Sequence, residues 1–146
     1  MTGASPYYDQ LKGVWSFKRT IIDQRLNQTL TAQGQASFQP AETPQTLLYR
    51  EEGRFNADQE FFREYIYVFD GDKITILFAD DPTRGKIFQT ICPGTENITD
   101  RHLCGPDCYD GRYDFQTAQC FVIAQQVTGP RKNYTMETIY NRSKTL

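Results

Sequence analysis

The chain has 146 residues, of which 23% are charged and 38% are hydrophobic, and its formal net charge is −2 at pH 7. This length fits a single domain over residues 1–146 with one hydrophobic core, and the composition excludes a disordered chain. The charge balance offers no basic surface for nucleic acid, and no run reaches the roughly 18 apolar residues of a membrane-spanning helix. We therefore expect neither a nucleic-acid partner nor a membrane partner.

The N-terminal residues predict a short helix over about 5–12 that plugs one end of the fold. The opening stretch MTGASPYYDQLKG has neither the basic segment nor the apolar segment of a secretory signal peptide. We therefore expect a cytoplasmic protein in which the four cysteines are free thiols. Disulfide bonds are the alternative if the protein is exported.

The rest of the chain is patterned as β-strands separated by turns. LTAQGQASF (30–38) alternates strictly and carries small residues that suit a tightly curved strand, and EFFREYIYVF (60–69) is rich in aromatic and β-branched residues. Asp70-Gly71-Asp72 is typical of a hairpin turn. The segments that predict strands are, in chain order, 11–22, 30–38, 46–55, 60–69, 73–78, 86–91, 102–115, 119–128 and 133–142.

These segments predict an all-β fold. About eight to ten strands joined by short turns, without alternating helices, favour a single antiparallel up-and-down barrel over a parallel sheet. A β-sandwich is the alternative architecture. A barrel of about eight strands has an interior that holds either packed side chains or one small ligand.

The stretch HLCGPDCYDGRYDF (102–115) holds the one histidine and two of the four cysteines. A structural zinc site needs four ligands at characteristic spacings that His102, Cys104 and Cys108 do not supply, so we predict no metal. On one strand His102 and Cys104 lie about 6–7 Å apart, too far for a catalytic cysteine–histidine pair. Haem ligation by His102 stays open as an alternative, although no cofactor is predicted. The alternation of the remaining residues favours a barrel strand that is kinked at Gly105-Pro106.

Two features resemble the signature of the lipocalin and calycin barrels. Gly13-x-Trp15 lies in the first predicted strand, after the short helix, and Arg142 lies at the end of the last strand. In that superfamily the arginine packs over the tryptophan and closes the bottom of the barrel. The resemblance therefore implies that Trp15 and Arg142 form the structural closure of a calycin-like barrel.

A longer set of motifs resembles a small uncharacterised family, a domain of unknown function with a calycin/lipocalin-like β-barrel. This resemblance extends from Leu11 to Arg142 and implies the fold, but it implies no established activity. The motifs are Tyr49-x-Glu51-x-Gly53, Arg63-x-Tyr65, His102-x-Cys104-Gly105-x-Asp107-x-Tyr109-x-Gly111-x-Tyr113, Val127-x-Gly129-Pro130-Arg131-Lys132-x-Tyr134 and Tyr140-x-Arg142.

Strand alternation places charged side chains on the predicted inner face. One face of 46–55 carries Tyr49 and Glu51, and one face of 60–69 carries Arg63. Charges are costly to bury unless they are paired and hydrogen-bonded. Either Glu51 and Arg63 neutralise each other in a structural network, or they belong to a polar pocket for a planar or anionic ligand.

We predict a small-molecule-binding barrel, which we favour over an enzyme. Glu51 can neutralise only one of the three cations Arg63, Arg131 and Lys132. We therefore expect a net positive pocket and rim that focus small anions inward. The expected ligand has a carboxylate or similar anionic group, which suits an arginine fork, and a planar body that stacks against Tyr65 or Tyr109. The predicted ligand-binding residues are Tyr49, Glu51, Arg63, Tyr65, His102, Tyr109 and Tyr113 in the lumen, and Arg131 and Lys132 at the rim.

Two other functions stay open. An isomerase-like, lyase-like or chromophore-handling enzyme on the same barrel could use His102 or Glu51 as an acid–base group, although no motif identifies a catalytic residue. The barrel could also be a protein-interaction scaffold with a filled lumen. The sequence specifies neither the ligand nor the oligomeric state.

Overall fold

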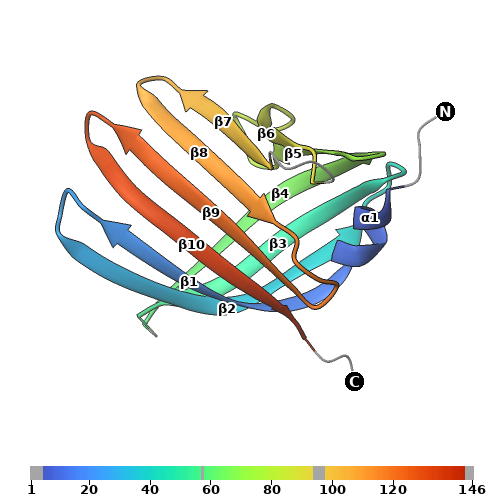
Figure 1. Cartoon of the computed structure of the whole chain (residues 1–146), viewed down its shortest axis with the longest axis horizontal. Helices are drawn as coiled ribbons and strands as arrows, with labels where there is room; N and C mark the ends of the chain where they lie inside the picture. The colour runs from blue at the N-terminus through green and yellow to red at the C-terminus, as the bar shows by residue number, and fades with distance from the viewer. Residues whose placement is uncertain (1–4, 57, 94–97, 144–146) are drawn as a thin grey trace.

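The described residues form one short helix and ten strands. The computed structural model describes residues 5–56, 58–93 and 98–143. The elements are α1 (Pro6–Leu11), β1 (Gly13–Asp23), β2 (Gln28–Pro40), β3 (Thr46–Phe55), β4 (Gln59–Asp70), β5 (Lys73–Phe78), β6 (Ile87–Ile91), β7 (Thr99–Cys104), β8 (Asp107–Asp114), β9 (Cys120–Gly129) and β10 (Lys132–Arg142) (Figure 1).

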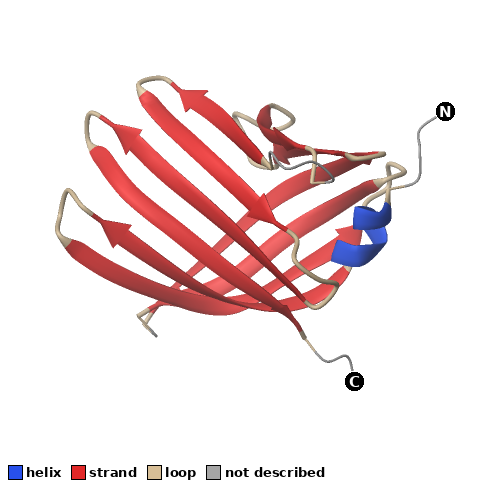
Figure 2. Ribbon diagram, in the orientation of Figure 1, coloured by secondary structure: helices blue, strands red, loops and turns tan. Residues whose placement is uncertain are grey.

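All ten strands belong to one antiparallel sheet with the order β6-β5-β4-β3-β2-β1-β10-β9-β8-β7. The sheet is strongly curved, and its strands are joined by short turns (Figure 2). The first and last strands of the chain, β1 and β10, are paired side by side from Trp15↔Arg142 to Asp23↔Tyr134. The predicted all-β, up-and-down barrel is therefore confirmed, and it is nearly closed.

The barrel closes at a seam between β6 and β7, the two ends of the sheet. Within the described residues these strands share no backbone ladder, and side chains bridge them instead. The Thr90 amide donates to the Asp100 carboxylate at 2.6 Å, and the Gln89 amide group donates to the carbonyls of Asp100 and Tyr109 at 3.4 and 3.2 Å.

One end of the lumen is closed by α1 and a large aromatic cluster. Trp15 is fully buried, donates its indole N–H to the Leu11 carbonyl at 2.8 Å and packs edge-on against Phe121. The Arg142 guanidinium lies 4.2 Å from the centre of the Trp15 ring and donates to the carbonyls of Lys12 and Gln10. The arginine therefore ties the helix to the last strand while covering the indole.

The segment 102–115 differs from its prediction. It is not one kinked strand, because β7 and β8 form a hairpin in which Cys104 pairs with Asp107. Gly105, at φ 58°, takes the left-handed conformation that a two-residue hairpin turn requires. The Gly105-Pro106 pair reverses the chain, so His102 and Tyr109 face each other across the hairpin instead of following one another along one strand.

Strands β2 and β3 approach each other closely where two glycines pair. Gly34 lies opposite Gly53, and a Cβ on Gly34 would lie 2.0 Å from the Glu52 carbonyl oxygen. Only glycine fits at such a distance. Gly34 and the buried Ala32 and Ala36 lie on the inner face of β2, so no large side chain of β2 projects from this part of the strand into the barrel.

Candidate functional site

A cavity of about 620 Å³ occupies the barrel interior away from the α1 end. This volume lies in the range of small-molecule sites. Side chains from every strand line it: Arg19, Ile21, Asp23, Leu30, Tyr49, Glu51, Phe55, Arg63, Glu64, Tyr65, Tyr67, Ile76, Phe78, Asp80, Thr83, Phe88, His102, Cys104, Tyr109, Tyr113, Ile123, Gln125, Tyr134, Met136, Thr138 and Tyr140.

A buried ion pair forms one wall of the cavity. The Arg19 guanidinium donates to both oxygens of Glu51, at 2.6 and 2.9 Å, and its Nε donates to the Thr138 hydroxyl at 2.7 Å. Burial alone would raise the pKa of Glu51, but the hydrogen bonds and charge of Arg19 outweigh it and lower the pKa below its usual value. Glu51 is therefore an ionised, fully engaged carboxylate.

Two phenols extend this network. The Tyr49 hydroxyl donates to Glu51 at 2.6 Å and lies 2.8 Å from the Tyr140 hydroxyl. Burial, followed by the negative charge of Glu51, raises the pKa of Tyr140 to about 12. Burial likewise raises the pKa of Tyr49 well above its usual value. Both phenols therefore stay protonated at neutral pH.

Arg63 lines the same cavity but is not part of this ion pair. It lies opposite Glu51 in the β3–β4 ladder, yet Glu51 binds Arg19, so the alternative in which Glu51 and Arg63 neutralise each other is wrong. Among the described carboxylates, none lies within 4 Å of the Arg63 guanidinium. Arg63 is solvent-exposed within the cavity lining, and an arginine side chain is charged at any physiological pH.

Arg19 reaches Glu51 because β2, the strand between them, carries small residues on its inner face. Arg19 pairs with Ala32 in the β1–β2 ladder, and Glu51 pairs with Ala36 in the β2–β3 ladder. Small side chains on the inner face of β2 leave room for the guanidinium to cross this strand beside the Phe17 ring, 4.9 Å from the ring centre. A larger residue there would separate the two charges.

Aromatic rings form the cavity wall near the seam. Tyr65 stacks on Phe88 with ring centres 5.6 Å apart and an interplanar angle of 24°. His102 contacts the rings of Phe78, Phe88 and Tyr109 at 5.5, 5.2 and 6.2 Å. Flat apolar surface therefore lies on the same side of the lumen as the seam.

A glutamine pair anchors the seam beneath this wall. The side-chain amides of Gln89 and Gln125 exchange hydrogen bonds at 3.1 and 2.8 Å, and the Tyr113 hydroxyl donates to Oε1 of Gln89. A Cβ on Gly111 would lie 2.3 Å from that same oxygen, so the glycine makes room for Gln89. The Tyr113 hydroxyl is therefore engaged in the structure of the barrel.

The structure brings together the seven residues that were predicted for the lumen. Tyr49, Glu51, Arg63, Tyr65, His102, Tyr109 and Tyr113 all line the cavity. Whether these residues bind a ligand stays a prediction, since geometry places them without testing binding.

The two predicted rim residues lie at the β9–β10 turn, outside the described lining of the cavity. Neither Arg131 nor Lys132 belongs to the described lining of the cavity. Lys132 pairs with Asp107 at 3.2 Å and donates to the Tyr109 hydroxyl at 3.4 Å. The Arg131 carbonyl accepts a hydrogen bond from Arg25.

The expectation of a net positive pocket and rim is also wrong. The lining holds two arginines, Arg19 and Arg63, and the four carboxylates Asp23, Glu51, Glu64 and Asp80. Glu64 reaches outward to Arg50 at 3.4 Å, and the Asp23 carboxylate accepts amide hydrogen bonds in the β1–β2 turn. Local pairing therefore matters more than the sum of charges. Of the two arginines in the lining, Arg63 is the one without a salt bridge among the described residues, and the carboxylates of Asp23 and Asp80 also have none there.

Sequence reasoning missed Arg19 as a site residue. Its signal was present, because Arg19 shares the alternation of Trp15 and Phe17 and so points inward. Thr138 was also missed, although a similar signal was present, because it shares the inner face of β10 with Tyr140.

The described residues contain no group of three or more histidine, cysteine or acidic side chains that could hold a metal ion. The four cysteines form no disulfide, and Cys104 lines the cavity. The described chain also has no helix of the length and apolar character needed to cross a membrane.

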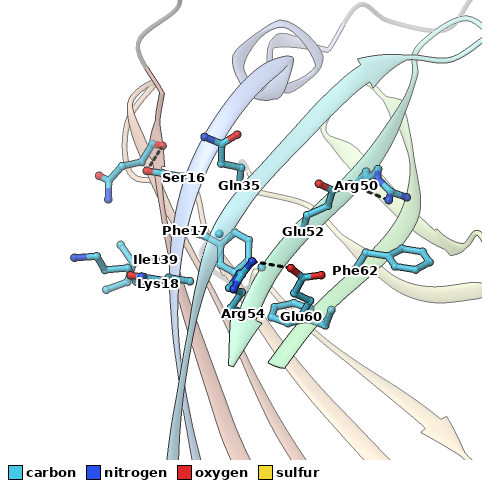
Figure 3. A pocket seen from close by; sticks show the side chains of 15 residues that line it. Ser16, Phe17, Lys18, Gln35, Arg50, Glu52, Arg54, Glu60, Phe62 and Ile139 are labelled. Carbon is cyan, nitrogen blue, oxygen red and sulfur yellow. Dashed lines mark hydrogen bonds and ion pairs between the residues drawn. The ribbon is translucent and has the colours of Figure 1, made fainter. Parts of the chain in front are cut away.

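A second concavity of about 1220 Å³ lies over strands β1 to β4 and β10 (Figure 3). Its arginines pair with its carboxylates, because Arg54 donates to Glu60 at 2.7 Å and Arg50 to Glu52 at 3.0 Å. Lys18, in the same lining, has no ion pair among the described residues. Arg50 also covers the exposed Phe62 ring, 4.7 Å from its centre. This concavity lies on the outer face of the sheet, whereas the lumen surrounds its contents with side chains from every strand, so the lumen is the better candidate site.

Comparison with known proteins identifies a family and a fold. The sequence model of DUF6314, a family of unknown function, matches residues 11–142. No curated protein matches the sequence. The S-type phycobiliprotein lyase CPES from Guillardia theta has a similar structure, with a TM-score of 0.73, 11% sequence identity, and coverage of 96% of this chain and 92% of that one.

Two further structures share the fold more distantly. The designed barrel EF1p2_mFAP2b bound to DFHBI has a TM-score of 0.53 at 16% identity, covering 92% of this chain and 95% of that one. A protein of unknown function from the DUF3598 family of Nostoc punctiforme PCC 73102 has a TM-score of 0.52 at 11% identity, covering 97% and 51%. At these identities the likeness establishes the fold alone.

Proposed function

The chain belongs to DUF6314, a family of unknown function, and we propose from its cavity that it is a small-molecule-binding barrel whose ligand joins an anionic group to a planar body. The observation that carries the proposal is Arg63, a guanidinium in the cavity lining without a salt bridge to any described carboxylate. The neighbouring Arg19 is neutralised by Glu51, so Arg63 is the cation that a ligand anion would meet.

Arg63 is exposed within the cavity lining, so its guanidinium keeps its charge without a carboxylate partner and is free to donate hydrogen bonds to a ligand. Its planar fork matches a carboxylate or phosphate with two parallel hydrogen bonds. Arg63 is not needed as the hydrogen-bonded counter-ion of Glu51, because Glu51 already has Arg19. An incoming anion would complete the interactions that the chain leaves open.

The aromatic wall supports the planar part of the ligand. Tyr65, Phe88, His102 and Tyr109 offer ring faces and edges within one part of the cavity, and planar groups pack well against such surfaces. Two proteins of similar fold support this proposal: one is a phycobiliprotein lyase, and the other is a designed barrel bound to DFHBI.

Binding is favoured over catalysis by the state of Glu51. Both of its oxygens accept hydrogen bonds from Arg19, one also accepts from Tyr49, and its pKa is lowered. A carboxylate held in this way is a poor general base or acid near neutral pH.

The test is a matched pair of planar probes. Biphenyl-4-carboxylate and biphenyl-4-carboxamide share one ring system and differ in charge. In calorimetric titrations the carboxylate should bind roughly tenfold or more tightly than the carboxamide, as expected for a hydrogen bond between charged groups. Equal affinity of the two probes, or no binding of either, would overturn the proposal.

A further inference from the structure

Tyr67 lies deeper in the same cavity and carries a hydroxyl group that the protein leaves unused. It is 3% exposed, lies on the inner face of β4 and lines the cavity. Across the described parts of the chain its hydroxyl has no hydrogen-bond partner, although nearly every other buried side-chain polar atom has one. In those parts, Oε1 of Gln45 is the sole fully buried side-chain nitrogen or oxygen atom without a hydrogen-bond partner. The Tyr67 hydroxyl is therefore not fully buried, and it reaches the open space of the cavity that Tyr67 lines.

The Tyr67 ring is held in place by its neighbours. It packs at 89° against Phe38, 5.1 Å away, and lies 5.7 Å from the Tyr49 ring and 6.4 Å from the Phe69 ring. A ring fixed on several sides presents its hydroxyl at a fixed point, which lowers the entropic cost of a hydrogen bond to a ligand.

The hydroxyl acts as a donor. Burial, with the neighbouring Tyr113 and Tyr140, raises the pKa of Tyr67 well above its usual value, so the phenol keeps its proton at neutral pH. A hydroxyl that reaches the cavity without a partner among the described residues is free to donate to an acceptor on the ligand.

Arg63, Tyr65 and Tyr67 alternate along one face of β4, which gives about 13 Å between the first and last α-carbons. Tyr65, between them, stacks on Phe88. The inner face of β4 thus offers an anion-binding end, an aromatic middle and a hydrogen-bond donor at the deeper end.

We propose that the ligand is an elongated planar acid with a neutral hydrogen-bond acceptor, such as a ketone or amide carbonyl, at the end remote from its anionic group, and that Tyr67 is the donor that recognises it. This inference rests on the proposed function and adds the second recognition point. Arg63 selects for the acid, and Tyr67 selects among acids.

The test uses two acids of the same shape, 4′-acetylbiphenyl-4-carboxylate and 4′-isopropenylbiphenyl-4-carboxylate. They differ at the remote end by a carbonyl oxygen in place of a methylene group. The acetyl compound should bind the unmodified protein at least fivefold more tightly in calorimetric titrations, and Tyr67→Phe should abolish that preference. Tyr8→Phe, a matched variant at the closed end beside Phe69, should leave the preference intact.

The outcomes separate the two proposals. If the acids bind but the acetyl and isopropenyl compounds bind equally, or if Tyr67→Phe keeps the preference, the role of Tyr67 is wrong and the anion site stands. If neither acid binds, both proposals fail. Should Tyr67→Phe fail to fold, equal binding of the two acids to the unmodified protein would still refute the inference.

Discussion

The two halves of the barrel interior are built on different principles. At the α1 end, Trp15 is fully buried, its indole N–H is satisfied by Leu11, and Arg142 has carbonyl partners on Gln10 and Lys12. In the cavity half, Arg63 lacks a salt bridge among the described residues. The polar groups of Trp15 and Arg142 have partners at one end, whereas Arg63 and Tyr67 are left open to a ligand at the other, so stability and recognition are assigned to different parts of the barrel.

The same contrast exists between two arginines within the cavity. Arg19 has a carboxylate and a hydroxyl as partners and is 5% exposed, whereas Arg63 is exposed and faces a Glu51 that is already occupied. A buried ion pair costs most when one partner is removed, because the other charge is left uncompensated. The two arginines should therefore respond very differently to substitution.

The largest loss of stability is expected from Trp15→Ala. It removes a fully buried indole, its hydrogen bond to Leu11 and the surface under Arg142. The free energy of unfolding, measured by chemical denaturation, should fall by about 3–5 kcal/mol. A loss below about 1 kcal/mol would show that the α1 end does not carry the stability assigned to it.

Arg19→Met should cost about 3–5 kcal/mol, because it leaves the Glu51 carboxylate buried without its counter-ion. The double variant Arg19→Met with Glu51→Gln should recover part of this loss in the same denaturation experiment, since no buried charge then remains. If the single variant were as stable as the unmodified protein, the ion pair would not be the structural element of the cavity wall.

Alkaline pH should weaken the cavity half. The folded pKa of Tyr140, about 12, lies above its ordinary value of 10, so the protonated phenol contributes stability that is fully present below about pH 10. That contribution is lost as the pH rises from 10 to about 12, where the unfolded chain releases the proton first. Unfolding free energies measured across this window should fall, and Tyr140→Phe should flatten the fall. An unchanged slope in Tyr140→Phe would contradict this assignment.

The sequence was sufficient for elements that depend on local pattern. The predicted strands 46–55 and 73–78 agree with β3 and β5 at both ends, because alternation and the Asp70-Gly71-Asp72 turn are local signals. The hairpin at Gly105-Pro106 was misread because a glycine–proline pair can kink one strand or reverse the chain, and only the pairing partner distinguishes these outcomes.

The inward-facing residues of the site were predictable, but their pairing was not. Glu51 and Arg63 are neighbours on adjacent strands, which made them the obvious pair. Arg19 instead crosses a whole strand to reach Glu51, and this depends on the small inner residues of β2 and on the curvature of the closed barrel. Alternation says which way a side chain points, whereas the partner across a lumen follows from the three-dimensional closure.

The most direct test of the account compares Arg63→Met with Arg50→Met, an arginine of the neighbouring strand that lies on the outer surface and pairs with Glu52 and Glu64. Denaturation should place both variants within about 0.5 kcal/mol of the unmodified protein. In calorimetric titrations with biphenyl-4-carboxylate, Arg63→Met should lose roughly tenfold or more in affinity, and Arg50→Met should bind normally. The account would be contradicted if Arg63→Met bound the carboxylate as tightly as the unmodified protein, or if it lost several kcal/mol of stability as a structural partner of Glu51 would.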